Sequence, residues 1–103
     1  MSRKISFMLP TGTSMLEEVV TIPREDSPQE TETFQVMITK SRVYGNIIFT
    51  VAADSLNTNT SVTKWGADKV DPEPIILNSG VLGCQVTFRL TVDPRRYTLD
   101  VEF

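Results

Sequence analysis

The chain of 103 residues contains no histidine and a single cysteine, Cys84. Without histidine, a His-based catalytic triad is excluded, and so are the usual zinc sites, which need three or four His or Cys ligands. One cysteine cannot form an internal disulfide. The five glycines are scattered, so a glycine-rich phosphate-binding loop is missing as well. The sequence therefore predicts that the protein is not an enzyme and binds neither a cofactor nor a metal ion.

Long hydrophobic runs are also missing. No stretch reaches the ~18 apolar residues that a membrane span requires, and the apolar run near the N-terminus is too short for the core of a signal peptide. We therefore expect no membrane contact, no secretion by a standard signal peptide, and a location in the cytoplasm or in a virion. The net charge of −3 gives no overall attraction to nucleic acid.

What the sequence does have is alternation. Hydrophobic residues make up 40% of the chain, enough for one folded domain, residues 1–103, with one core. Apolar and polar side chains alternate over residues 5–9, 34–38, 47–52 and 84–92, and no window shows a helical period. This pattern predicts an all-β fold: an antiparallel sheet, a small β-sandwich or a jelly roll of six to eight strands with little or no helix.

The C-terminal stretch predicts a particular hairpin. If residues 93–96 form the loop, Leu90 faces Leu99 on the apolar side and Arg89 faces Asp100 on the polar side. Cys84 falls on the apolar side, where we expect it to act as a small hydrophobic residue. The last strand is expected to leave an unshielded sheet edge, which would favour pairing with another copy of the chain.

Three further local predictions follow from the pattern. Residues 5–9 and 16–22 are expected to form an N-terminal hairpin around the turn at residues 10–13. Six acids lie in residues 17–32 against Arg24 alone, and we expect this acidic segment to be solvated. The Gly45-Asn46 dipeptide is expected to form a turn.

The polar stretch of residues 53–73 holds the candidate ligand-binding side chains. Trp65, the only tryptophan, could stack on a sugar or a nucleobase, although a loop tryptophan more often anchors the loop to the core. Asp68, Asp71 and Glu73 are hard oxygen ligands at a spacing that could hold calcium. Lys69 lies among them and the spacing is not that of an EF-hand, so an ordinary polar loop is favoured.

One predicted sheet face is flat and rich in threonine, with Arg89 as its only charge. Such a surface suits contact with another protein or with an RNA strand. Its expected members are Gln35, Met37, Thr39, Ile48, Thr50, Ala52, Gln85, Thr87, Arg89 and Thr91.

The strand layout resembles that of the coat proteins of small RNA bacteriophages. The stretch KISFMLPTGTSMLEEVVTI is similar to their N-terminal hairpin, and TFQVMITKSRVYGNIIFTVAADSLN and CQVTFRLTVDP are similar in rhythm to their meander strands. In that family one sheet face binds an RNA hairpin through threonines and basic residues. The family ends in helices that interlock two subunits, whereas this chain ends in a strand. The resemblance implies RNA contact by Thr39, Thr50, Thr87 and Arg89, with Lys40 and Arg42 nearby.

Two functions are therefore expected from the sequence. The first is a structural subunit that self-associates through sheet edges or faces, in its largest form a virion coat. Its contacts with partner or nucleic acid would come from Lys40, Arg42, Thr50, Thr87 and Arg89. The alternative is a small lectin-like module that binds a ligand through Trp65, Asp68 and Asp71.

Overall fold

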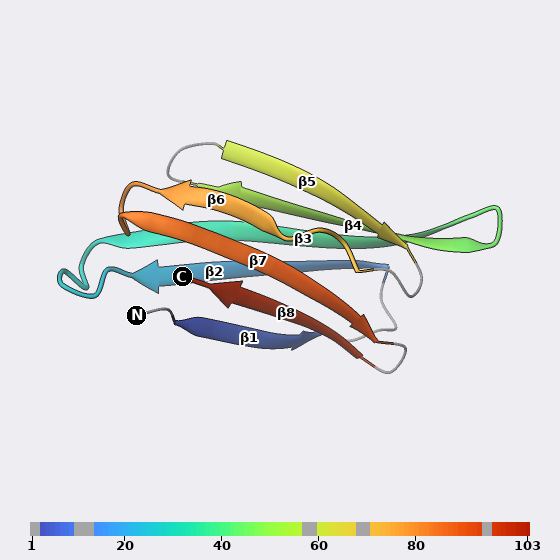
Figure 1. Ribbon diagram of the computed structural model, residues 1–103, viewed down its shortest axis with the longest axis horizontal. Coiled ribbons are helices and arrows are strands. Elements are labelled where there is room, and N and C mark those ends of the chain that lie inside the picture. The colour runs from blue at the N-terminus through green and yellow to red at the C-terminus, as the bar shows by residue number, and fades with distance from the viewer. Residues whose placement is uncertain (1–2, 10–13, 57–59, 68–70, 94–95) are drawn as a thin grey trace.

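The computed structural model describes residues 3–9, 14–56, 60–67, 71–93 and 96–103, and these residues form strands and no helix (Figure 1). The predicted all-β fold is confirmed. The strands are β1 (Lys4–Leu9), β2 (Met15–Pro23), β3 (Thr31–Val43), β4 (Asn46–Ser55), β5 (Thr60–Ala67), β6 (Ile75–Ser79), β7 (Cys84–Asp93) and β8 (Arg96–Glu102).

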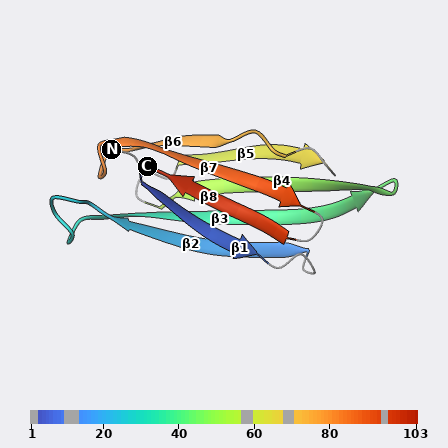
Figure 2. The same cartoon turned by 60° about the horizontal axis from the view of Figure 1, so that its bottom comes forward.

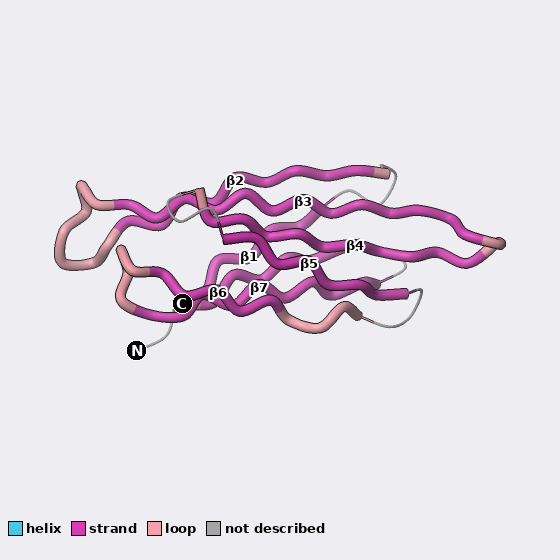
Figure 3. The backbone as a smooth tube through the Cα atoms, turned by 90° about the horizontal axis from the view of Figure 1, so that it is seen from above, coloured by secondary structure: helices cyan, strands magenta, loops and turns pink. Residues whose placement is uncertain are grey.

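The strands pack as two antiparallel sheets, one on the other (Figures 1 and 3). One sheet has the order β1-β8-β7-β6 and the other β2-β3-β4-β5. The predicted N-terminal hairpin is wrong, because β1 pairs with β8 and β2 pairs with β3 in the opposite sheet. Alternation identified both strands but could not identify their partners. Leu9 and Val20 are both buried, so the two strands contribute to the core from opposite sheets.

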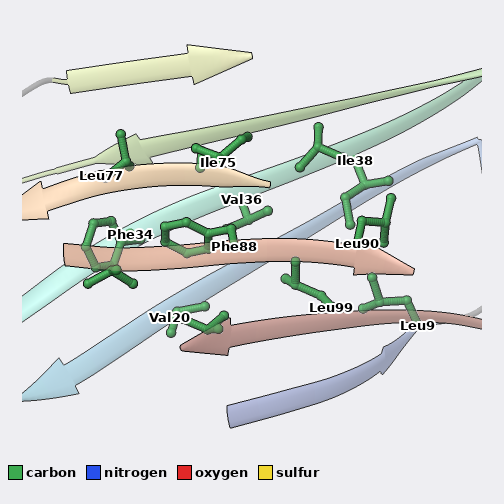
Figure 4. Packing of buried hydrophobic residues seen from close by; sticks show 14 of the residues in the cluster. Leu9, Val20, Phe34, Val36, Ile38, Ile75, Leu77, Phe88, Leu90 and Leu99 are labelled. Atoms are coloured by element: carbon green, nitrogen blue, oxygen red, sulfur yellow. The ribbon is translucent and has the colours of Figure 1, made fainter. Parts of the chain in front are cut away.

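The core lies between the two sheets and is built from the inward side of each alternating strand (Figure 4). Phe34 of β3 meets Phe88 of β7 edge to face, with ring centroids 5.0 Å apart. Phe49 of β4 meets Tyr97 of β8 in the same way at 5.3 Å. Burying one such side chain stabilises a fold by about 1.5–3 kcal/mol, and the pair geometry adds about 0.5–1.5 kcal/mol. The packing of these two aromatic pairs therefore helps to hold the two sheets together.

The predicted C-terminal hairpin is confirmed in its register, with Leu90 opposite Leu99 and Arg89 opposite Asp100. The expected open edge is wrong, because β8 lies between β1 and β7. The pairing even continues past the strand ends: the Arg3 amide donates to the Phe103 carbonyl at 2.6 Å, and the Phe103 amide donates back at 2.8 Å. The edge strands are β1 and β6 in one sheet and β2 and β5 in the other.

Two other local predictions need correction. Cys84 is exposed rather than buried, because it opens β7 opposite Ser79, beyond the last core pair of that ladder. The turn between β3 and β4 consists of Tyr44 and Gly45, with φ angles of 50° and 83°, and Asn46 already belongs to β4. Two consecutive positive φ angles are typical of a type I′ hairpin turn, which matches the right-handed twist of the strands that it joins.

Glu32 contradicts the prediction of a solvated acidic segment, since its side chain is wholly buried. The cause is the start of β3 at Thr31, which places Glu32 on the same inward side as Phe34. The Ser55 hydroxyl donates a hydrogen bond to Glu32 Oε1 at 3.0 Å. Glu32 Oε2 is buried without a hydrogen-bond partner among the described residues.

We predict that Ser55→Ala lowers the free energy of unfolding by about 1–3 kcal/mol, because it leaves both oxygens of a buried carboxylate without a donor among the residues that the structure describes. A chemical denaturation curve measures the change. Ser6→Ala is the matched control, because Ser6 also donates to a carboxylate, that of Asp100 at 2.6 Å, but on the surface. The control should cost less than about 0.5 kcal/mol. Equal costs for the two variants would contradict the structural role of the buried pair.

Candidate functional site

The predicted partner-binding residues do not share one surface. Thr50 points outward from the β2-β3-β4-β5 sheet. Thr87 and Arg89 point outward from the β1-β8-β7-β6 sheet, on the opposite side of the sandwich. The sequence indicated which side chains point away from the core but not which strands belong to the same sheet. A single flat partner therefore cannot contact all three residues at once.

Lys40 and Arg42 lie on the inward side of β3, where this strand extends past the core. Lys40 Nζ is placed over the ring of Tyr97, 5.9 Å from its centroid. Arg42 is exposed on the part of the β3–β4 hairpin that projects beyond the rest of the molecule (Figure 2). These two basic residues form a third location, at the end of the sandwich.

The candidate ligand-binding residues of the 53–73 stretch are only partly described. The backbone of Trp65 lies in β5 opposite Thr50, and its side chain lies outside the described part of the structure, as does all of Asp68. Asp71 Oδ1 accepts a hydrogen bond from the backbone amide of Val92 at 2.8 Å, which ties the segment before β6 to the end of β7. Within the described ranges, the acids and Cys84 form no group of three that could hold a metal ion.

The segment before β6 also packs closely on β5. A Cβ atom built on Gly66 would lie 2.7 Å from both Cγ and Cδ of Pro72, closer than real Cβ atoms approach other atoms. Pro72 itself is buried. Gly66 is therefore required for this close approach, and with Asp71 it determines where the segment crosses from one sheet to the other.

We predict that Gly66→Ala lowers the free energy of unfolding by about 1–3 kcal/mol, because a methyl group at this position forces Pro72 away from β5. Gly80→Ala is the matched control, since nothing lies within 4 Å of the place that its methyl group would occupy and its φ is not positive. The control should be neutral or slightly stabilising. Thermal unfolding of both variants tests the pair, and a harmless Gly66→Ala would contradict the close packing of Pro72 on β5.

The outer face of the β2-β3-β4-β5 sheet, called here the threonine face, is poor in charge. It carries two acids and no basic residue among its described members, and Glu17 accepts a hydrogen bond from Gln35. Met15 and Val19 on β2 are 60% and 58% exposed. The described members of this face are Met15, Glu17, Val19, Thr21, Thr33, Gln35, Met37, Thr39, Ile48, Thr50, Ala52, Asp54 and Thr63.

The outer face of the β1-β8-β7-β6 sheet is different, because opposite charges face each other across its strands. Lys4 on β1 lies opposite Glu102 on β8, and Asp100 on β8 lies opposite Arg89 on β7. Cross-strand pairs of opposite charge are typical of a face that stays in water. The two outer faces of the sandwich therefore have distinct chemistry.

The β2–β3 and β6–β7 connections lie at the same end of the sandwich (Figure 1). Residues of both connections line a cleft of about 430 Å³. It combines apolar and charged side chains, and the Arg3 guanidinium lies 4.7 Å from the centroid of the Phe103 ring. This cleft is called here the end cleft. Its lining consists of Arg3, Arg24, Glu25, Asp26, Leu82, Cys84 and Phe103.

Arg24 is held in place at the end cleft by ion pairs. Its Nε lies 2.6 Å from Asp26 Oδ1 and its Nη1 lies 3.2 Å from Glu30 Oε2. The hydrogen bond and charge of Asp26, followed by the hydrogen bond from Glu30, raise the pKa of the Arg24 guanidinium. Arg24 therefore stays charged at every accessible pH, and its donors are directed toward acids of its own loop.

No protein-family model, curated protein or solved structure matches this chain. The resemblance to phage coat proteins therefore stays a prediction. Among the residues that the structure describes, no helix is long and apolar enough to cross a membrane.

Proposed function

We propose that the protein is a non-enzymatic assembly subunit that associates with further copies of itself through the threonine face. The observation that carries this proposal is the contrast between the two outer faces. Both faces expose apolar side chains, Met8 and Ile76 on one and Met15 and Val19 on the other, but only the first face also has cross-strand pairs of opposite charge. Exposed apolar side chains that share a charge-poor face mark an interaction surface.

A second copy fits this face better than a nucleic acid does. The described members of the face include Glu17 and Asp54 but no lysine or arginine, so the face offers no positive charge to phosphate groups. A flat face that meets its own copy across a twofold axis buries the same apolar residues on both sides, and twofold dimers are the commonest protein assemblies. RNA contact would depend instead on Lys40 and Arg42 at the projecting hairpin.

The sheet edges support self-association less well than the face does. Edge strand β2 has Glu18 on its inward side, half-buried, and Pro23 at its end. Inward charges and prolines are features by which natural sheets prevent edge-to-edge pairing. We therefore assign the self-association of the chain to the threonine face rather than to a sheet edge.

A virion coat is the largest assembly that this proposal includes, and it requires more than one kind of contact between copies.

The lectin-like alternative stays a prediction. Asp71 already accepts a hydrogen bond from the backbone amide of Val92, so its carboxylate is less suited to bind a ligand. Loss of glycan binding in Trp65→Ala, with the oligomer intact, would favour that alternative.

We predict that Val19→Lys reduces self-association by about tenfold or more, because it places a positive charge at the apolar part of the threonine face on both copies. Size-exclusion chromatography with light scattering measures the result. The wild-type mass should exceed the 11.5 kDa of one chain and rise with concentration, and the variant should stay near 11.5 kDa at the same concentrations.

The control is Ile76→Lys, because Ile76 is equally exposed at 55% but lies on the outer face of the other sheet. This variant should keep the wild-type mass. An unchanged mass for Val19→Lys, or the same loss for both variants, would contradict association through the threonine face.

A further inference from the structure

The β3–β4 hairpin extends well beyond the strands on either side of it. The register of β2 with β3 ends at Thr39, and the register of β5 with β4 begins at Ile48. Residues 41–46 between these points are all exposed. This segment, called here the arm, projects at one end of the long axis (Figures 1 and 2). The molecule is 48 Å long but only 24 and 19 Å across.

The tip of the arm has an unusual residue. Tyr44 is fully exposed and has a φ of 50°, next to Gly45 at 83°. The first position of a type I′ turn favours Asn, Asp or Gly, because other side chains are strained at positive φ. An aromatic residue thus occupies a strained position where it contributes nothing to the core. Tyrosine is one of the residue types enriched at interface hot spots.

The β2–β3 and β6–β7 connections, which contribute to the lining of the end cleft, lie at the opposite end of the long axis from the arm (Figure 3). An arm therefore cannot reach the cleft of its own molecule, but it can reach that of a neighbour. The cleft holds a partly buried apolar part formed by Leu82 and Phe103, beside the Arg3 guanidinium. An aromatic ring can pack against such side chains, and cations favour contact with a tyrosine face.

The arm region and the loop of residues 24–30 have charges of opposite sign. Between Glu32 and Asp54 the chain contains no acid, and it contains the bases Lys40 and Arg42. The loop at the other end, residues 24–30, contains one base, Arg24, and three acids, Glu25, Asp26 and Glu30. Arg24 is paired with Asp26 and Glu30, and Glu25 is exposed. The end cleft as a whole is lined by two bases, Arg3 and Arg24, and two acids, Glu25 and Asp26. The excess of negative charge that an incoming Arg42 would meet is therefore that of the loop, at Glu25.

We propose that the arm of one copy docks in the end cleft of the next, with Tyr44 as its anchor and Arg42 facing Glu25. This contact rests on the proposed function, since it adds a second interface to a self-associating subunit. It is heterologous: each copy uses its arm on one neighbour and its cleft on another, which generates rings or open chains. Together with a twofold contact through the threonine face, it supplies the two kinds of interface that an extended assembly needs.

Cross-linking tests the contact directly, because the exposed Cys84 lines the end cleft and is the only cysteine. Val43→Cys places a second thiol on the exposed arm next to Tyr44 and keeps the anchor in place. Under mild oxidation this variant should give a ladder of covalent dimers, trimers and longer chains on a non-reducing gel. The double variant Val43→Cys with Cys84→Ser should give no ladder by itself. Mixed with wild-type chains, it should give dimers alone.

Tyr44→Asn tests the anchor without damaging the fold, because asparagine is favoured at positive φ. Its melting temperature should equal or exceed that of the wild type, while arm-to-cleft association should weaken by about 30-fold, the size of a hot-spot loss. The control is Ile76→Asn, which removes an exposed apolar side chain that belongs neither to the arm nor to the lining of the end cleft and should leave association unchanged.

The outcomes separate the two proposals. Oligomers that keep their full size in Tyr44→Asn would overturn the arm contact and leave the threonine-face contact standing. A covalent dimer that persists when Cys84 is replaced would also overturn it, because the arms would then meet each other. Wild-type chains that stay monomeric at all concentrations would instead overturn the proposed function itself.

Discussion

The whole structure depends on the packing of two alternating sheets through aromatic contacts at their centre. Phe34 against Phe88 and Phe49 against Tyr97 connect strands that are distant in sequence and belong to different sheets. Each of these aromatic side chains points into the core. Because successive residues on a strand point to opposite faces, this determines which other side chains of the same strand point inward and which point outward. The same constraint explains the buried Glu32, which shares the inward side of β3 with Phe34.

The surfaces available for function are what this packing leaves outside. The sandwich has a charged outer face, a charge-poor threonine face and two different ends. Edge strand β2 is protected by an inward glutamate, so contact through a face is more consistent with the fold than pairing through an edge. A face contact and an end contact differ in symmetry, and together they extend an assembly in more than one direction.

The sequence predicts local features best. Alternation and the turn at residues 93–96 were enough to predict the register of β7 with β8, because each residue has one favourable partner there. The sequence could not predict sheet membership, which depends on contacts between distant strands. For that reason the sequence pattern predicts a β1–β2 hairpin that the fold does not have, and it places Thr50 on one face with Thr87 and Arg89. The arm and the end cleft were also missed, although the run of residues 33–53 without an acid is a signal that could have pointed to the arm.

Self-association is the central claim, and sedimentation velocity of the unmodified chain over a wide concentration series tests it most directly. Species heavier than 11.5 kDa should appear and grow with concentration. They should also weaken as salt is raised, because an arm and a loop of opposite charge attract each other less when screened. A single 11.5 kDa species at every concentration would contradict the account.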